Sequence, residues 1–480
     1  MVYLIIQILC FILSLTGIAF LVPVATALYC GEYSVLSSFL IPMISVWVVS
    51  IAVVFLTRKK KSRLSIRASF VVVALAWVCI SLFGALPFYI SGAIPSFTDA
   101  FFESVSGFTT TGSTILSEIE TLPRSINLWR CLTHWIGGMG IVVLTVALLP
   151  ILGVGGFQLV KAETTGPEKG KVTAKITTTS KILWLIYLAL TLIETLILKC
   201  LGMDFIDALS HSFSTLGTGG FSTRNSSIGS FNSPAIEIVC TVFMFLAGVN
   251  FSMYYYLIAR KFSDIRDNSE LKFYILIIVV AILLIASNLT SVFKSFTTAL
   301  RYASFQVAAI LSTTGFANAD YLDWPAFSQM IIFILFFIGG CSGSTSGGVK
   351  VVRWLVLLKA LHIEFKEMLH PHGVFAMRLN KRNARKELVN NIASFLTLYL
   401  GLILITTIIG TIGKLDILSA FTGSITMVGN VGPAYGVLGP SANFGFLPAF
   451  VKWWYCFAMI AGRLEFFTIF VFFVPSFWKK

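Results

Sequence analysis

Four short segments repeat along the chain in one local register, and this repeat restricts the fold more than any other feature of the sequence. Their shared glycines are Gly112, Gly220, Gly315 and Gly432, which lie about one hundred residues apart, a period too long for a solenoid repeat. Each glycine follows a helix-length stretch and belongs to a tip rich in threonine or glycine: TTTGS, GTGGF, STTGF and GNVGP. We therefore expect four copies of one module around a common centre.

Apolar composition places these modules in a membrane. Hydrophobic residues make up 57% of the 480-residue chain, and charged residues make up 12%. Several apolar runs exceed the roughly 20 residues that a helix needs to cross about 30 Å of hydrocarbon. Backbone groups in lipid must bond to one another, so these runs are expected to be helices. The first run, 2–28, has no basic residue before it and is too long for a signal peptide, so we expect a retained helix.

The predicted fold is all-α and integral to the membrane, with ten transmembrane helices. Two helices precede the first repeat, and each repeat then contributes two helices that flank a pore loop. The expected helices are 2–28 and 35–57, then the pairs 68–90 and 128–152, 181–200 and 234–260, 270–292 and 326–357, and 388–412 and 449–477. The expected units are an N-terminal two-helix extension, 1–62, and four pore repeats, 63–160, 161–268, 269–366 and 367–480. Two spans per repeat keep the copies parallel, so they surround a pseudo-fourfold pore.

The net charge of +14 is distributed as a membrane topology signal rather than as a surface for nucleic acid. The main basic clusters lie at 58–67, 161–181, 260–272 and 350–386, and two lysines end the chain. Two spanning segments separate successive clusters, so all of them, and both termini, can face the cytoplasm. Attraction to membrane lipids follows as a side effect. The eight cysteines form no CxxC pair and indicate neither a disulfide nor a metal site.

The four tips are expected on the face opposite the basic clusters, and their residue types suit a dehydrated cation. Segments too short to span must enter and leave on one side, around a cavity or inside protein. Carbonyl rings replace ion hydration in potassium filters, glycine lets carbonyls turn through positive φ, and threonine adds a hydroxyl oxygen. Ordinary outer turns are the alternative, but they do not explain a fourfold register. The predicted ligands are Thr110, Thr111, Gly112, Thr218, Gly219, Gly220, Thr313, Thr314, Gly315, Asn430, Val431 and Gly432.

A short helix is expected before each tip, with its C-terminal end toward the pore. Its dipole would favour a monovalent cation at the centre by roughly 1 kcal/mol per helix. Four such helices favour cations without trapping them. The expected N-caps are Asp99, Asp207 and Ser419, with Thr297 or Thr298 in the third repeat.

The second helix of the third repeat contains a run, Ile338–Lys350, that a continuous helix does not favour. Its sequence, IGGCSGSTSGGVK, is dominated by glycine, serine and threonine. A helix that is broken at membrane depth must line a cavity at the break. The position of this break favours a gate below the quarter of the filter that the third repeat contributes. Close helix packing through small residues is the alternative, and the GxxxxGK[ST] pattern of a phosphate loop is not met. The predicted gating residues are Gly339, Gly340, Gly343, Ser344, Gly347, Gly348 and Lys350, and we expect this break in the third repeat alone.

Arg463, in the sequence AGRLEFF, is predicted to lie in the pore below the filter. A charge within the membrane faces protein or water and marks function by default. Arg463 could repel cations or hold the carbonyls of the glycine-rich run, and a structural ion pair with Glu194 is the alternative. Glu465, two residues on, is expected on another helix face.

One further position is equivalent in all four repeats, at the same distance before each glycine. Glu103 at this position could stabilise the filter from behind, or it could make an ordinary buried hydrogen bond. The position is occupied by Glu103, His211, Gln306 and Gly423.

These motifs together resemble the TrkH branch of the Trk/Ktr/HKT potassium-transporter superfamily, over almost the whole chain. The most specific segments are DAFFESVSGFTTTGST, HWIGGMGI, GTGGFST, STTGF, GGCSGSTSGGVK, GNVGP and AGRLEFF. The helix pair before the first repeat favours this branch over the shorter KtrB type. The resemblance implies that the tips form a potassium filter, that the broken helix is an intramembrane gating loop, and that Arg463 contacts it. It also implies a homodimer in the bacterial inner membrane, with a cytosolic TrkA-type ring that binds the nucleotides, so this chain is expected to bind none.

The predicted function is potassium uptake through a selective, gated pore. The alternative is a sodium- or proton-coupled potassium symporter. An enzyme is not expected, because catalysis requires convergent reactive groups and the ionisable residues within the apolar runs are few and scattered. Loops 161–181 and 378–386 are the expected contacts for the ring. In the fourth tip Asn430-Val431-Gly432 lacks the threonine of the others, which leaves its carbonyl geometry open.

Overall fold

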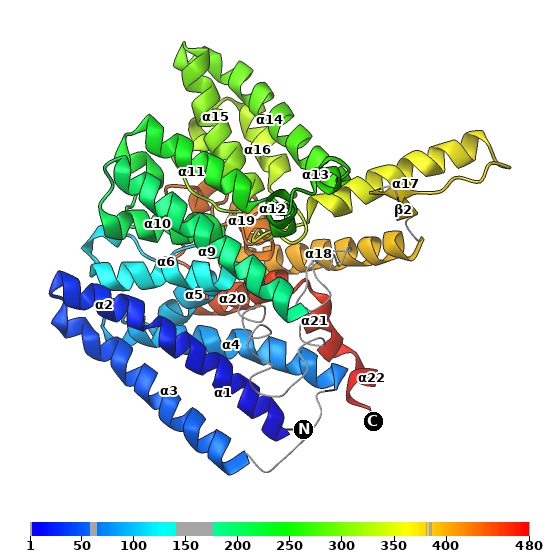
Figure 1. The fold of residues 1–480 in the computed structure, drawn as a ribbon. Helices are drawn as coiled ribbons and strands as arrows, with labels where there is room; N and C mark the ends of the chain where they lie inside the picture. The colour runs from blue at the N-terminus through cyan, green and yellow to red at the C-terminus, as the bar shows by residue number, and fades with distance from the viewer. Residues whose placement is uncertain (1, 58–64, 141–175, 381, 384–385, 480) are drawn as a thin grey trace.

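The computed structural model describes residues 2–57, 65–140, 176–380, 382–383 and 386–479, and this part of the chain is almost entirely helical (Figure 1). The only strands among these residues, β1 (Arg378–Leu379) and β2 (Arg382–Asn383), pair as a short antiparallel hairpin. Six helices in the described ranges are long and apolar enough to cross a membrane, and two bent helix pairs raise this number to eight. The predicted all-α membrane fold is confirmed.

The N-terminal extension lies against the first repeat. It comprises α1 (Val2–Ala19), α2 (Leu21–Cys30), the 3-10 turn η1 (Tyr33–Val35) and α3 (Leu36–Thr57). The helix predicted at 2–28 is therefore two helical segments, which meet at Phe20. Glu32, just after α2, accepts hydrogen bonds from the backbone N–H groups of Arg124 (2.7 Å) and Ser125 (3.0 Å). Because Pro123 leaves the first turn of the next helix, α6, without a side-chain cap, the extension supplies that cap.

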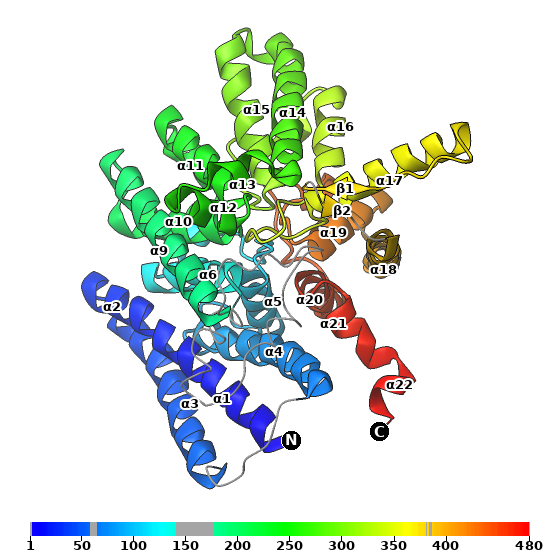
Figure 2. The same cartoon turned by 45° about the vertical axis from the view of Figure 1, so that its right-hand side comes forward.

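The four repeats follow one another around the centre of the molecule (Figure 2). Repeat 1 contains α4 (Ile66–Ile90), α5 (Phe97–Phe108) and α6 (Arg124–Gly138). Repeat 2 contains α9 (Ile176–Cys200), α10 (Phe205–Gly217), α11 (Pro234–Ala247), α12 (Phe251–Ile258) and α13 (Phe262–Arg266), and repeat 3 contains α14 (Ser269–Phe293), α15 (Phe296–Leu311), α16 (Ala326–Leu335) and α17 (Val351–Leu369). Repeat 4 contains α18 (Lys386–Ile412), α19 (Ile417–Gly429), α20 (Ala449–Arg463), α21 (Phe467–Phe470) and α22 (Pro475–Trp478). Short 3-10 turns η2 (Ile119–Thr121), η4 (Ser227–Phe231), η5 (Tyr321–Asp323), η6 (Gly436–Leu438) and η7 (Val471–Phe473) connect some of them.

Contacts between consecutive repeats close the ring. At three boundaries the pore helix of one repeat packs against the second helix of the repeat before it: α6 lies on α10, α11 on α15, and α20 on α5, while α17 packs on α18 between repeats 3 and 4. The contact of α20 with α5 joins repeat 4 to repeat 1. The short pore helices α5, α10, α15 and α19 therefore all lie inside a closed circle of longer helices.

Helix breaks are not confined to the third repeat, so that expectation was wrong. The predicted helix 234–260 is the pair α11 and α12, bent by 93°, and 449–477 contains the pair α20 and α21, bent by 111°. Asn250 starts α12 as a new N-cap, with its side chain accepting from the Ser252 N–H at 2.8 Å. At the other break, Glu465 and Phe466 have φ of 52° and 57°, which a helix cannot include. The break in the third repeat is the longest, because it separates α16 from α17 by the whole of Phe336–Lys350.

Some sequence predictions concern residues outside those described. Of the helix predicted at 128–152, the structure describes α6 and the chain as far as residue 140. Most of the basic clusters at 58–67 and 161–181, including the first proposed contact loop, lies outside the described residues.

Candidate functional site

The pore helices precede the four tips as predicted, but their N-caps lie one turn earlier than expected. Because Ser96, Asp204 and Asp416 also suit a cap, the helices gain a turn of backbone hydrogen bonds by starting there. The predicted caps Asp99, Asp207 and Ser419 lie in the first turn instead, and α15 begins after Ser295, so neither Thr297 nor Thr298 caps it. The observed caps accept from the N–H groups of Asp99, Ile206 and Ser419. At Asp416 these hydrogen bonds from Ser419 hold the pKa of the carboxyl below its ordinary value.

Asp99 and Asp207 form ion pairs rather than caps. The Asp99 carboxylate lies 2.5 Å from the Lys452 amine of α20, a contact that joins repeat 4 to repeat 1. Asp207 accepts from Thr223 at 2.9 Å and from Arg224 at 3.0 Å, just beyond its own tip. Both carboxylates therefore tie the outer ends of the pore helices to neighbouring chain.

The four tips share one backbone conformation. Two residues before each glycine the chain is left-handed, with φ of 55° at Thr110, 54° at Thr218, 57° at Thr313 and 53° at Asn430, and the glycines themselves have φ of 81°, 81°, 77° and 103°. The N–H of the residue between bonds back into its own pore helix in every repeat: Thr111 to Ser106 (2.9 Å), Gly219 to Ser214 (2.9 Å), Thr314 to Ala309 (2.8 Å) and Val431 to Thr426 (3.0 Å). Because these N–H groups are satisfied internally, carbonyl oxygens are what each tip can offer to a ligand.

The glycines place each tip directly against the next. A Cβ atom on Gly112 would collide with the carbonyl oxygen of Gly219, and one on Gly220 with that of Thr314. A Cβ on Gly315 would collide with the carbonyl oxygen of Val431, and one on Gly432 would lie 2.7 Å from that of Thr111. Each of these carbonyls belongs to the residue before the next glycine, so the contacts run once around the ring and close it. This packing explains why all four positions must be glycine.

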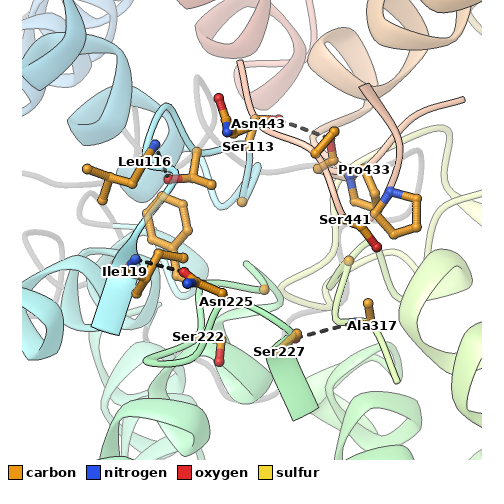
Figure 3. A pocket seen from close by; sticks show the side chains of 18 of the residues that line it. Ser113, Leu116, Ile119, Ser222, Asn225, Ser227, Ala317, Pro433, Ser441 and Asn443 are labelled. Atoms are coloured by element: carbon orange, nitrogen blue, oxygen red, sulfur yellow. Dashed lines mark hydrogen bonds between the residues drawn. The ribbon is translucent and has the colours of Figure 1, made fainter. Parts of the chain in front are cut away.

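A pocket with a volume of about 120 Å³ opens at the ring formed by these tips. Figure 3 shows that all four repeats line it, through Ser113, Ser222, Ala317 and Pro433 among others. Ser113 donates to the Gly432 carbonyl oxygen at 3.0 Å, which links the first and fourth tips. Its charged lining residues, Arg130 and Arg224, are basic, and no carboxylate lines the described part of this pocket. The lining of this pocket therefore combines hydroxyl groups and backbone with two guanidinium groups.

A buried ion pair supports the tips of repeats 1 and 2. The Glu103 carboxylate lies 2.8 Å from the Arg130 guanidinium, and both side chains are fully buried. Glu103 also accepts from the Thr114 hydroxyl (2.9 Å) and the Ile115 N–H (3.0 Å), just after the first tip. Arg130 donates to the Ser222 carbonyl oxygen (3.2 Å), just after the second tip. Glu103 thus stabilises the ring from behind, as one of the two sequence interpretations proposed.

The equivalent residues in the other repeats make progressively weaker contacts. His211 bonds to the Ser222 hydroxyl at 2.9 Å, and Gln306 donates to the Ala319 carbonyl oxygen at 3.2 Å. Gly423 has no side chain, and the adjacent Thr422 hydroxyl instead accepts from the Tyr435 N–H, just after the fourth tip. Support behind the ring therefore falls from a charge pair in repeat 1 to a single hydroxyl in repeat 4.

Sequence reasoning missed the role of His134 in α6. Its Nδ1 lies 2.8 Å from the carbonyl oxygen of Gly107, and its Nε2 accepts from the N–H of Phe221 at 3.2 Å. A Cβ on Gly219 would collide with the ring, so the imidazole packs flush against the second tip. His134 therefore joins the first pore helix to the second tip. The sequence signal that could have indicated this role is a histidine in HWIGGMGI that has no counterpart in the other three repeats.

The predicted gating residues form a loop that contacts the tips of repeats 3 and 4. The ends of the loop pair with each other, Gly339 N–H to Val349 carbonyl (2.9 Å) and Val351 N–H to Gly340 carbonyl (3.2 Å). Ser344 donates back to Cys341, the Lys350 amine donates to the Ser346 carbonyl, and Gly343 and Gly348 take positive φ of 76° and 65°. At its far side the Gly347 N–H donates to the Thr313 hydroxyl at 2.7 Å.

Neighbouring repeats hold this loop by backbone contacts. The Cys341 N–H donates to the Gly248 carbonyl oxygen (2.8 Å) at the break between α11 and α12. The Glu270 carboxylate, at the start of α14, accepts from the N–H of Ser342 (2.6 Å) and of Val352 (3.2 Å). The loop is thus a fixed part of this conformation rather than a free tether.

Arg463 lies at the inner end of α20 and holds the loop, as one of its predicted roles required. It donates to the Thr345 carbonyl oxygen at 2.8 Å and to those of Gly137 and Gly138 at 2.7 and 3.0 Å. The alternative of an ion pair with Glu194 is wrong, because neither carboxyl oxygen of Glu194 has a hydrogen-bond partner among the described residues. Arg463 therefore connects repeats 1, 3 and 4 at the end of α6.

Glu465 does not point away from the loop region. Its carboxylate lies 2.6 Å from the Arg353 guanidinium, three residues beyond the loop, and Arg353 also stacks 3.7 Å from the centre of the Phe395 ring. The expectation of a different helix face was based on a continuous helix, and α20 ends before Glu465. Two arginine contacts thus tie the loop to repeat 4.

Among the described residues no group of three or more histidine, cysteine or acidic side chains could hold a metal ion. All eight cysteines are free. The possible cation ligands at the ring are neutral hydroxyl and carbonyl oxygens. Such oxygens suit a weakly hydrated monovalent cation that binds weakly enough to leave again.

The chain is similar to known transport proteins over most of its length. Residues 36–480 match the TrkH family, described as cation transport proteins. It is 40% identical to the Trk system potassium uptake protein TrkH of Halomonas elongata and 39% identical to that of Escherichia coli K12, with 88% of each chain covered. It is 32% identical to the E. coli Trk system potassium uptake protein TrkG, over 98% of this chain and 97% of the other.

A solved structure shares the whole fold. The crystal structure of the potassium transporter TrkH from Vibrio parahaemolyticus superposes with a TM-score of 0.88, at 34% sequence identity, with 100% of both chains covered.

Proposed function

Because this chain belongs to the TrkH family of cation transport proteins, we propose that it takes up potassium across the bacterial inner membrane through a selective, gated pore. Potassium is then the transported ion, and the chain catalyses no reaction and binds no nucleotide. The pore repeats are 63–160, 161–268, 269–366 and 367–480, behind the extension 1–62.

The closed ring of four tips carries this proposal. Glycines in one conformation pack each tip on the carbonyl of the next, and all four repeats contribute residues to the pocket in front. Such a ring presents neutral oxygens from all sides to one central line, which is how a dehydrated potassium ion is bound. The ligands are the backbone carbonyls and hydroxyls of the twelve predicted tip residues, with Asn430 in place of threonine in the fourth.

The gate is the loop Phe336–Lys350 with Arg463. The loop contacts the ring at Gly347, and the guanidinium of Arg463 donates to its carbonyl at Thr345. A positive charge at this depth also repels cations, so release of the loop must move or screen it. This state is therefore the closed one.

Coupled symport is the second candidate, and one residue favours it. Glu194 in α9 is fully buried, and among the described residues neither carboxyl oxygen has a hydrogen-bond partner. The hydroxyl of the neighbouring Thr215 donates to the His211 carbonyl oxygen instead, at 2.8 Å. An ionisable group inside a membrane protein is a natural site for a coupling proton. Reversal potentials with and without a sodium or proton gradient distinguish the two mechanisms.

The assembly we propose is a homodimer, bound at its cytoplasmic face by a TrkA-type nucleotide-binding ring and surrounded by membrane lipids. In both views the far end of α17 extends away from the helical body, which suits contact with a cytosolic partner (Figures 1 and 2). Loop 161–181 is the second expected contact. Both termini are placed in the cytoplasm.

Rubidium flux into liposomes that contain the purified chain tests the function. We expect uptake that potassium inhibits and sodium does not, together with growth rescue of a potassium-uptake-deficient strain. Gly220→Asp should abolish both, because the side chain would occupy the space of the Thr314 carbonyl. Normal flux in Gly220→Asp would remove the filter assignment.

A further inference from the structure

The hydroxyl groups at the equivalent tip position have different partners in each repeat. The Thr110 hydroxyl has no hydrogen-bond partner among the described residues, and that of Thr218 donates to its neighbouring Gly217 carbonyl at 2.7 Å. The Thr313 hydroxyl accepts the Gly347 N–H at 2.7 Å. Asn430 carries an amide, which donates to the Thr111 hydroxyl and the Met459 carbonyl, each at 3.0 Å. Only the third repeat thus gives its tip hydroxyl to the loop.

The loop packs tightly at this point. A Cβ on Gly347 would lie 2.5 Å from the Gly429 carbonyl oxygen, and one on Gly348 would lie 3.6 Å from the Thr313 methyl group. Thr313 is 1% exposed. The hydrogen bond is therefore dry, and it costs free energy to break unless another group replaces the loop N–H.

A cation and an N–H group both bind to the lone pairs of a hydroxyl oxygen. A threonine oxygen that accepts an N–H at 2.7 Å offers less electron density to an ion, and the partial positive charge of that N–H repels one. Resting on the proposed function, we propose that the Gly347 N–H competes with the transported cation for the Thr313 hydroxyl oxygen. The loop closes the pore partly by capping a ligand of the filter, and occupancy of that ligand by a cation favours release of the loop.

The position in the first repeat provides a matched control. Thr313→Val removes both an ion ligand and the loop contact, whereas Thr110→Val removes the same hydroxyl with no loop contact. Thr313→Ser keeps the acceptor oxygen. We measure rubidium flux into liposomes over a range of rubidium concentrations, without any added partner.

We expect both valine variants to raise the rubidium concentration that gives half-maximal flux, because each loses an ion ligand. Only Thr313→Val should also raise the saturated flux, by about fivefold, which corresponds to the loss of one net hydrogen bond. Thr313→Ser should return the saturated flux to the wild-type level. Equal effects of Thr313→Val and Thr110→Val would overturn the competition while leaving the filter intact. Unaltered flux in Gly220→Asp would instead overturn the proposed function.

Hydrogen exchange gives a second readout that does not depend on flux. In the wild-type chain, replacing sodium by potassium should speed exchange of the backbone amides at 339–350. In Thr313→Val these amides should exchange faster in both salts, with no potassium effect. Exchange in the wild type that is insensitive to potassium would contradict the proposal, even if the valine variants fold poorly.

Discussion

The corner where repeats 1 and 2 meet and the corner where repeats 3 and 4 meet have the same tip geometry and very different support. At the first, the buried pair of Glu103 and Arg130 and the ring of His134 connect two tips through side chains. At the second, the tips rest on the loop Phe336–Lys350, the proposed gate, through Gly347 and Gly429. The backbone conformation that all four tips share is thus supported by buried side chains on one side and by the loop Phe336–Lys350 on the other.

The largest expected effect is a break in the ring itself. Gly112→Ala places a Cβ against the Gly219 carbonyl at a φ of 81°, so we expect rubidium flux to fall roughly a hundredfold. Gly423→Ala is the control, because its Cβ would lie 2.8 Å from the end of the Leu438 side chain and would meet no backbone atom, and flux should change less than about threefold. Equal losses in the two variants would show that any added bulk impairs the ring.

The corner where repeats 1 and 2 meet should contribute more to the free energy of unfolding than the corner where repeats 3 and 4 meet. Glu103→Gln leaves the buried Arg130 charge without its partner, and we expect about 3 kcal/mol of unfolding free energy to be lost in detergent. Gln306→Ala, at the equivalent place in repeat 3, should cost about 1 kcal/mol. Removing both charges, as Glu103→Leu with Arg130→Met, should cost less than Glu103→Gln alone. If Gln306→Ala proved the more damaging, the order of the two corners would be reversed.

Changes at the corner where repeats 3 and 4 meet should have the larger effect on flux in the absence of a partner. Arg463→Gln removes charge-assisted hydrogen bonds to Thr345, Gly137 and Gly138, and we expect partner-independent flux to rise about tenfold. Arg124→Gln, which removes an exposed ion pair with Asp204, the N-cap of α10, is the control and should leave flux unaltered. A fall in flux after Arg463→Gln would mean that this side chain helps conduction rather than closure.

The smallest effect concerns the caps of the pore helices. Asp416→Ala should cost about 1 kcal/mol near neutral pH. Hydrogen bonds from Ser419 lower the pKa of Asp416, so its contribution is complete above the pKa of the unfolded chain and disappears as pH falls through the folded-state pKa, below about 4. Thermal unfolding against pH measures this. Ser96→Ala, which removes an uncharged cap, should lose stability equally at every pH.

Local pattern was sufficient for much of the architecture. Helices α3, α4, α14 and α18 begin and end within two residues of the expected ranges because long apolar runs must be helical in lipid. The register of the four glycines located the ring, and the small residues of Ile338–Lys350 located the loop. The caps at Asp99, Asp207 and Ser419 were misplaced, because two good capping residues stand one turn apart and local sequence does not decide between them.

The bends at Gly248–Asn250 and Leu464–Phe466 were not predicted. A glycine in an apolar run is compatible with a continuous helix, and Glu465 and Phe466 carry no local signal for positive φ. Their conformations follow from partners far away in the sequence: Gly343 and Cys341 bond to the first bend, and Arg353 pairs with Glu465 at the second.

By itself, the sequence determined that this chain is a membrane protein of four parallel repeats, because lipid leaves backbone groups no partners except one another and the repeated tips need one orientation. It also located the four glycines at which the tips pack against one another. Only the tertiary structure decided how the quarters differ. Glu103, Arg130, His134 and Arg463 act across repeat boundaries, and Thr313 meets Gly347 through a loop, so their hydrogen bonds depend on distances that no local pattern encodes.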